Sequence, residues 1–135
     1  MKKILVMFLL MLISLTSYSQ KKREVYYQTK FADIMKGQME VVLFDGTRAD
    51  IVTDTFVIEV DFSEKWAESI GQSLYYAEMT NRKAGVLLVV NGNLDERFIR
   101  RLMTVAVRKD ITVWLMDYTT EKWCKVDRFV EYSYS

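Results

Sequence analysis

The chain has 135 residues, of which 50% are hydrophobic and 27% charged, and it contains no proline. This composition is typical of a single globular domain. Its 19 basic and 18 acidic residues nearly balance, which excludes the overall basic excess of a dedicated nucleic-acid coat protein. The chain has no histidine, so Ser-His-Asp triads and histidine-based zinc sites are excluded, and any catalysis would depend on carboxylates, lysine and metal.

Residues 1–19 predict a secretory signal peptide. Two lysines precede an apolar stretch at residues 4–15, and small residues occupy positions 17 and 19, which a signal peptidase reads. The apolar stretch is shorter than the roughly 20 residues that a spanning helix needs, so an uncleaved anchor is the weaker alternative. We therefore expect an exported protein, periplasmic or secreted, whose mature domain is residues 20–135 and has no membrane span. Removing the two lysines leaves 17 basic against 18 acidic residues, a net charge of −1.

The first half of the mature chain predicts a helix followed by three strands. Residues 24–36 have the pattern of a helix with Val25, Phe31 and Ile34 on one side. Two apolar segments around Asp45-Gly46 predict a β-hairpin, and a third apolar segment after another tight turn extends it to an antiparallel meander. The three expected strands are residues 39–44, 47–53 and 56–62.

The second half predicts alternating helices and strands. Ser63 is expected to cap a helix over residues 64–79. A strand at 85–90, a helix at 94–109, a strand at 111–118 and an edge strand near the C-terminus follow. The whole order predicts an α/β sandwich around a central mixed sheet. The buried stripe of the helix at 64–79 is expected to consist of Trp66, Ile70, Leu74 and Ala77.

Three acidic residues in the meander are the main functional candidates. Strand alternation places Glu59 and Asp61 on one face of the third strand, and places Asp50 of the second strand on the face of Arg48 and Val52. If the two strands pair through their turn, the three carboxylates converge. Carboxylates so close together repel one another by several kcal/mol at an intermediate dielectric constant. A divalent cation with a preference for oxygen ligands, Mg²⁺ or Mn²⁺, is the simplest way to hold them together.

The next helix presents polar residues near the same place. Lys65 falls one turn past Asp61, and Gln72 and Tyr76 follow on the polar side of the helix. An Asp in one strand, a Glu-x-(Lys) element in the next and a helix with Gln-x-x-x-Tyr resemble the PD-(D/E)xK nuclease superfamily. The resemblance is strongest to the Q-x-x-x-Y branch, which includes exonuclease domains of bacterial recombination enzymes, and it spans residues 24–90. It implies a restriction-endonuclease-like α/β sandwich with an αβββαβ core, followed here by a further helix and strand.

The resemblance also implies roles for the matching residues. Asp50 and Glu59 would hold the metal ion beside Asp61, and the ion would polarise a phosphate of DNA or RNA and lower the pKa of a bound water. Lys65 would stabilise the charge that develops on the phosphate or help to deprotonate the water. Gln72 and Tyr76 match the substrate-positioning element, and Glu24 matches an accessory acid of the first helix.

Asp61 stands where the family pattern has lysine, and this departure keeps a second interpretation open. In some members the lysine lies in the neighbouring helix, and Lys65 is placed for that role. The alternative is a nuclease-fold domain that has lost catalysis and serves as a binding or protein-interaction module. The acids would then line a solvated sheet face, as antiparallel sheets often do.

Further candidates lie in the last third of the chain. Arg97, Arg100, Arg101 and Arg108 fall on neighbouring helical turns, which suits either a phosphate-attracting patch or a plain solvated face. Cys124 is the only cysteine, so an internal disulfide is excluded, and we expect the thiol to be buried. A third interpretation of the chain is an interaction protein that binds a partner by strand addition at its aromatic C-terminal edge.

Overall fold

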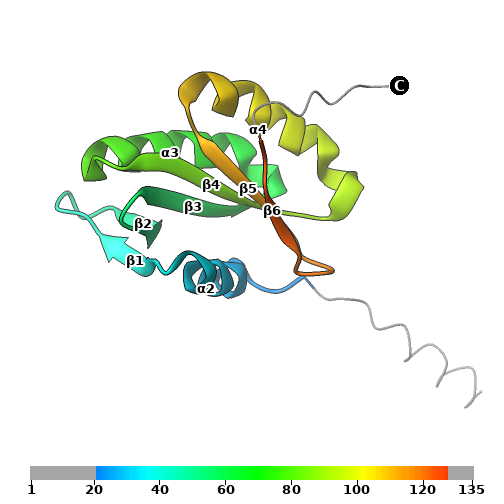
Figure 1. The fold of residues 1–135 in the computed structure, drawn as a ribbon, viewed down its shortest axis with the longest axis horizontal. Helices are drawn as coiled ribbons and strands as arrows, with labels where there is room; N and C mark the ends of the chain where they lie inside the picture. The colour runs from blue at the N-terminus through cyan, green and yellow to red at the C-terminus, as the bar shows by residue number, and fades with distance from the viewer. Residues whose placement is uncertain (1–20, 128–135) are drawn as a thin grey trace, which may run out of the picture.

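The computed structural model describes residues 21–127 (Figure 1). The expected signal peptide and the last residues of the aromatic C-terminal segment lie outside the described residues. Within residues 21–127, no helix is long and apolar enough to cross a membrane.

Within the described residues, six strands form one sheet whose spatial order follows the sequence: β1 (Gln38–Val42), β2 (Arg48–Val52), β3 (Phe56–Phe62), β4 (Lys83–Val90), β5 (Thr112–Asp117) and β6 (Trp123–Lys125). The pairs β1–β2, β2–β3 and β5–β6 are antiparallel, whereas β3–β4 and β4–β5 are parallel. The first three strands therefore form the predicted meander, and the sheet is mixed as expected.

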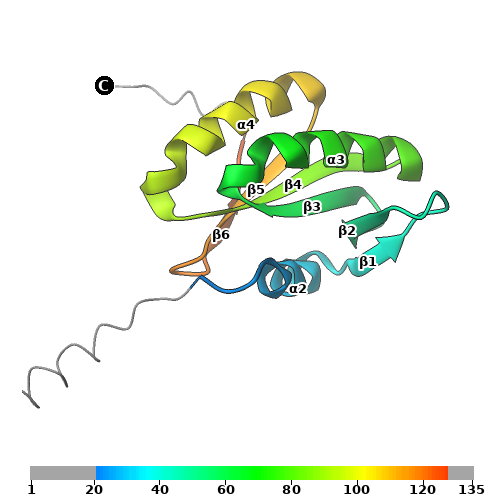
Figure 2. The same ribbon diagram turned by 180° about the vertical axis from the view of Figure 1, so that it is seen from behind.

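The helices of this part of the chain cover both faces of the sheet: α2 (Glu24–Met35), α3 (Trp66–Thr80) and α4 (Glu96–Lys109), with 3₁₀ turns η1 (Ser63–Lys65) and η2 (Gly92–Asp95) before α3 and α4. Figures 1 and 2 show α3 and α4 side by side on one face and α2 on the other. The crossovers from β3 to β4 and from β4 to β5 run in the same direction across the sheet, so the right-handed rule for such connections expects both of their helices on the same face. This arrangement confirms the predicted α/β sandwich.

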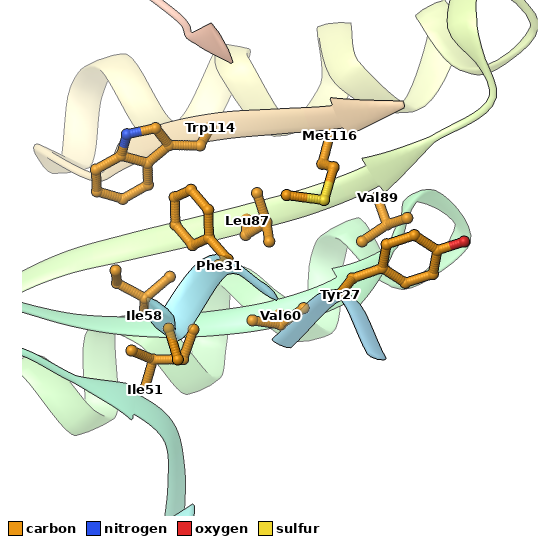
Figure 3. Packing of buried hydrophobic residues seen from close by; sticks show 10 residues of the cluster. Tyr27, Phe31, Ile51, Ile58, Val60, Leu87, Val89, Trp114 and Met116 are labelled. Atoms are coloured by element: carbon orange, nitrogen blue, oxygen red, sulfur yellow. The ribbon is translucent and has the colours of Figure 1, made fainter. Parts of the chain in front are cut away.

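The core under α2 is aromatic and aliphatic (Figure 3). Phe31 is fully buried, and its ring centroid lies 5.5 Å from that of Trp114. Gly85 makes room for this indole, since a Cβ at Gly85 would lie 2.8 Å from the Trp114 ring. The three apolar residues that the pattern grouped on one side of α2 differ in burial, because Phe31 is buried whereas Val25 and Ile34 are exposed. Its buried residues are instead Tyr27, Gln28, Phe31 and Ala32.

The core on the other face is formed by α3 and α4 against β4 and β5. The expected stripe of α3 packs there, which confirms the helical periodicity: Trp66, Ile70, Leu74 and Ala77. The expected cap at Ser63 is wrong, because its hydroxyl donates to Asp95 at 2.8 Å instead of capping the helix. The expected burial of Cys124 is also wrong, since the thiol lies on the exposed edge strand β6.

Candidate acidic site

Two acids of β3 are buried beneath α3. Glu59 and Asp61 are only 3% and 5% exposed, which is unusual for carboxylates. The alternate residues Ile58 and Val60 belong to the core under α2, so strand alternation turns the acids toward α3, as the sequence predicted. The two carboxylates are therefore not on a solvated sheet face.

Asp50 of β2 lies directly beside Glu59. Its Oδ2 atom accepts a hydrogen bond from the backbone N–H of Val60 at 2.8 Å, and its own N–H donates to Oε1 of Glu59 at 3.4 Å. The β2–β3 pairing extends only as far as Ile51 opposite Ile58. Beyond this point the Asp50 carboxylate accepts the N–H of Val60, in the place of a backbone carbonyl oxygen of β2.

The alternation of β2 is broken at Asp50. Ala49 and Val52 both pack with Tyr76 on the α3 side, whereas Ile51 belongs to the core under α2. A regular strand would turn Ala49 and Ile51 to the same face. The prediction that Asp50 shares a face with Arg48 and Val52 rests on regular alternation, which this strand does not keep between Ala49 and Ile51.

Gln28 of α2 stabilises this irregularity, and it was not among the predicted site residues. Its side-chain amide is 3% exposed and donates to Oε1 of Glu40 and to the carbonyl oxygen of Asp50, both at 2.9 Å. Glu40 has a positive φ of 53°, which is a bulge-like conformation in β1. A signal was present in the sequence, since Gln28 lies one helical turn after Glu24.

Burial and the negative charges of neighbouring carboxylates raise the pKa of all three acids. For Glu59, burial and then the charge of Asp50 raise the pKa to about 9. Burial is also the main reason why the pKa of Asp61 rises to about 7 and that of Asp50 to about 6. Asp50 and Glu59 titrate as a coupled pair, and their burial side by side favours one proton on the pair near neutral pH. At neutral pH the pair therefore carries one negative charge.

Asp61 differs from the other two acids in its hydrogen bonding. Among the described residues its Oδ2 atom is buried without a hydrogen-bond partner. Glu24, Asp50 and Glu68 raise its pKa by their negative charges, and Lys65 lowers it. A buried carboxylate oxygen without a donor is costly, so this atom points to a missing partner.

The other predicted residues surround the acids to different degrees. Lys65 is exposed and interacts electrostatically with Asp61 and Glu24. Glu24 is half-buried in the first turn of α2. Tyr76 is buried, and after burial the charges of Glu59 and Asp50 are the main causes that raise its pKa. Gln72 lies half-buried one turn before Tyr76, and among the described residues no hydrogen bond joins it to the acids.

The acids offer the oxygen ligands that a hard divalent cation prefers, but they are not arranged as a complete set of metal ligands. Within residues 21–127, no group of three or more acidic, histidine or cysteine side chains is placed to hold a metal ion. One reason is that the Asp50 carboxylate is directed to the N–H of Val60. The unpartnered oxygen of Asp61 and the all-carboxylate donor set are nevertheless those that Mg²⁺ or Mn²⁺ prefers.

Comparison with known proteins found no matching family model, no similar curated protein and no similar solved structure. A function for this chain has to be inferred from its own residues.

Proposed function

We propose that this protein is an exported, Mg²⁺- or Mn²⁺-dependent phosphodiesterase of the PD-(D/E)xK nuclease type that acts on DNA or RNA. The observation that carries the proposal is the Oδ2 atom of Asp61, which is buried without a hydrogen-bond partner within residues 21–127. It belongs to the same acidic group as the neighbouring Asp50 and Glu59. The order of elements from α2 to β4, with acids on β2 and β3 beneath α3, agrees with the resemblance noted in the sequence.

A bound cation would relieve the strain in this site. Three carboxylates lie in surroundings that raise the pKa of each of them, so the folded protein resists their ionisation. A divalent ion held by Asp50, Glu59 and Asp61 would displace the shared proton and give the Asp61 oxygen its partner. Burial of carboxylates without such a ligand brings no benefit to stability.

The site residues would then divide the work of phosphodiester hydrolysis. An ion held by Asp50, Glu59 and Asp61 would supply a Lewis acid for the phosphate and a bound water of lowered pKa. Lys65 is exposed and interacts electrostatically with Asp61, and its positive charge would meet the negative charge of a phosphate that approaches Asp61. Tyr76 closes the site on the side of the β1–β2 hairpin, where it packs with Ala49 and Val52.

A second candidate function is a nuclease-like domain that binds a partner without catalysis. The replacement of the family's lysine by Asp61 favours it, as does the lack of a ready-made ligand group within residues 21–127. Under this alternative the acids keep their protons and contribute only to the fold.

Cleavage assays distinguish the two candidates. Fluorescent single- and double-stranded DNA and RNA oligonucleotides are incubated with the purified protein and Mg²⁺ or Mn²⁺, and with EDTA. The proposal predicts metal-dependent cleavage that Asp50→Asn and Glu59→Gln abolish. Glu78→Gln on α3 removes an exposed carboxylate and should leave cleavage intact. Cleavage that persists in both site variants, or none with either metal, would refute the proposed activity.

A further inference from the structure

Helix α4 concentrates positive charge that the chain as a whole lacks. Residues Glu96–Lys109 contain four arginines and one lysine but a single acid, Glu96. The apolar side of the helix is buried against the sheet through Ile99, Leu102 and Ala106. The basic residues therefore occupy the outer side: Arg97, Arg100, Arg101, Arg108 and Lys109, all exposed.

The arginines follow one stripe along the helix. Arg97, Arg101 and Arg108 are separated by four and seven residues, and the exposed Thr104 lies between the last two. Positions with this spacing fall on one side of a helix, and eleven residues span about 16 Å. A stripe of this length matches several successive phosphates of a nucleic-acid backbone, which repeat every 3.4 Å along the axis of each strand.

Little of this charge is neutralised within the described part of the chain. There, Glu96 forms an exposed ion pair with Arg100 at 3.2 Å, and no ion pair of Arg97, Arg101 or Arg108 is present. The guanidinium of Arg97 lies over the ring of Phe98, 4.6 Å from its centroid. Such stacking orients the planar group and leaves its N–H donors at the edge.

We propose that the outer face of α4, defined by Arg97, Arg100, Arg101 and Arg108, binds the phosphate backbone of a nucleic acid. The choice of nucleic acid among polyanions rests on the proposed function. An anionic membrane is disfavoured, because a helix that lies in a lipid surface inserts its apolar side, and that side of α4 is occupied by the core.

The position of this surface also bears on how a phosphate backbone could approach the acidic site, whose negative charges repel it. The acids lie on β2 and β3, α3 covers β3 and β4, and α4 packs beside α3. The surface is thus separated from the carboxylates by the width of one helix. A phosphate backbone that the acids repel can therefore be held at α4 whether or not a cation is bound.

Fluorescence anisotropy tests the proposal in EDTA, where neither cleavage nor cation binding contributes. A labelled DNA duplex is titrated with the purified protein over a range of salt concentrations. We compare the wild type with Arg101→Gln/Arg108→Gln. The matched control, Arg23→Gln/Lys36→Asn, removes two exposed cations near the ends of α2, on the opposite face of the sheet.

We expect the wild type and the α2 control to bind with the same salt dependence. The α4 variant should bind more weakly, and the slope of log K against log salt should fall by about 1.8 for two lost phosphate contacts. Equal losses in both variants, or no binding of the wild type, would overturn the proposal. Binding to phosphatidylglycerol vesicles without binding to the duplex would assign the surface to membranes instead. Absence of cleavage with retained α4-dependent binding would refute the phosphodiesterase and leave this surface assignment standing.

Discussion

Replacement of Asp61 by asparagine should stabilise the metal-free protein at alkaline pH and not at acidic pH. Burial, followed by the charge of Glu24, raises the pKa of Asp61 from 3.8 to about 7. Between these values the folded protein binds more protons than the unfolded chain, so the free energy of unfolding falls as the pH rises. A difference of about three pKa units corresponds to a loss of about 4 kcal/mol above the folded pKa.

Asparagine removes this charge, but its amide group lacks a partner at the same place. Burial of an unpaired polar group costs about 1–3 kcal/mol, so the net stabilisation should be about 1–3 kcal/mol at about pH 8. At about pH 4.5 the folded wild type is protonated at Asp61, and the variant should be no more stable than the wild type. Urea denaturation in EDTA at both pH values measures the difference. A variant that is less stable than the wild type at alkaline pH, or a difference that does not change with pH, would refute the reasoning.

Two further predictions concern the core and the titration of the site. Gly85→Ala should destabilise the protein by about 1–3 kcal/mol, because the new methyl group would lie 2.8 Å from the ring of Trp114; an unchanged melting temperature would contradict this. The wild type in EDTA should also lose stability as the pH rises from about 5 to 9, because burial and the charge of Asp50 raise the pKa of Glu59 from 4.5 to about 9. In this range the folded state keeps a proton that the unfolded chain releases, so a stability that rises with pH would contradict the assigned protonation.

The sequence was sufficient for those parts of the site that depend on local periodicity. Alternation in Phe56–Phe62 placed Glu59 and Asp61 on the face opposite to Ile58 and Val60, and the structure has the same arrangement. Helical spacing likewise identified the side of α3 that packs on β4. These features require only that one strand and one helix be regular over their own length.

The break in β2 could not be predicted, because it depends on contacts between distant parts of the chain. Gln28 reaches from α2 to Glu40 and to the backbone of Asp50, and alternation alone carries no information about such a contact. Gln28 also explains why the apolar pattern of α2 does not match the residues that are buried. A buried glutamine does not count in an apolar pattern, so the pattern selects Val25 and Ile34, which are exposed, and passes over Gln28, which is buried.

Isothermal titration calorimetry of the purified protein with Mn²⁺ and with Mg²⁺ tests whether the acids form a cation site. The titration is repeated in two buffers of different ionisation enthalpy, which counts the protons that binding releases. We predict binding with proton release near neutral pH, because burial raises the pKa of the coupled Asp50 and Glu59 pair and an ion would displace the proton that the pair holds. Asp61→Asn and Glu59→Gln should each abolish binding, and Glu78→Gln should not. If the wild type shows no binding at millimolar metal, or if both site variants bind like the wild type, the acids are not a cation site and the proposed chemistry fails.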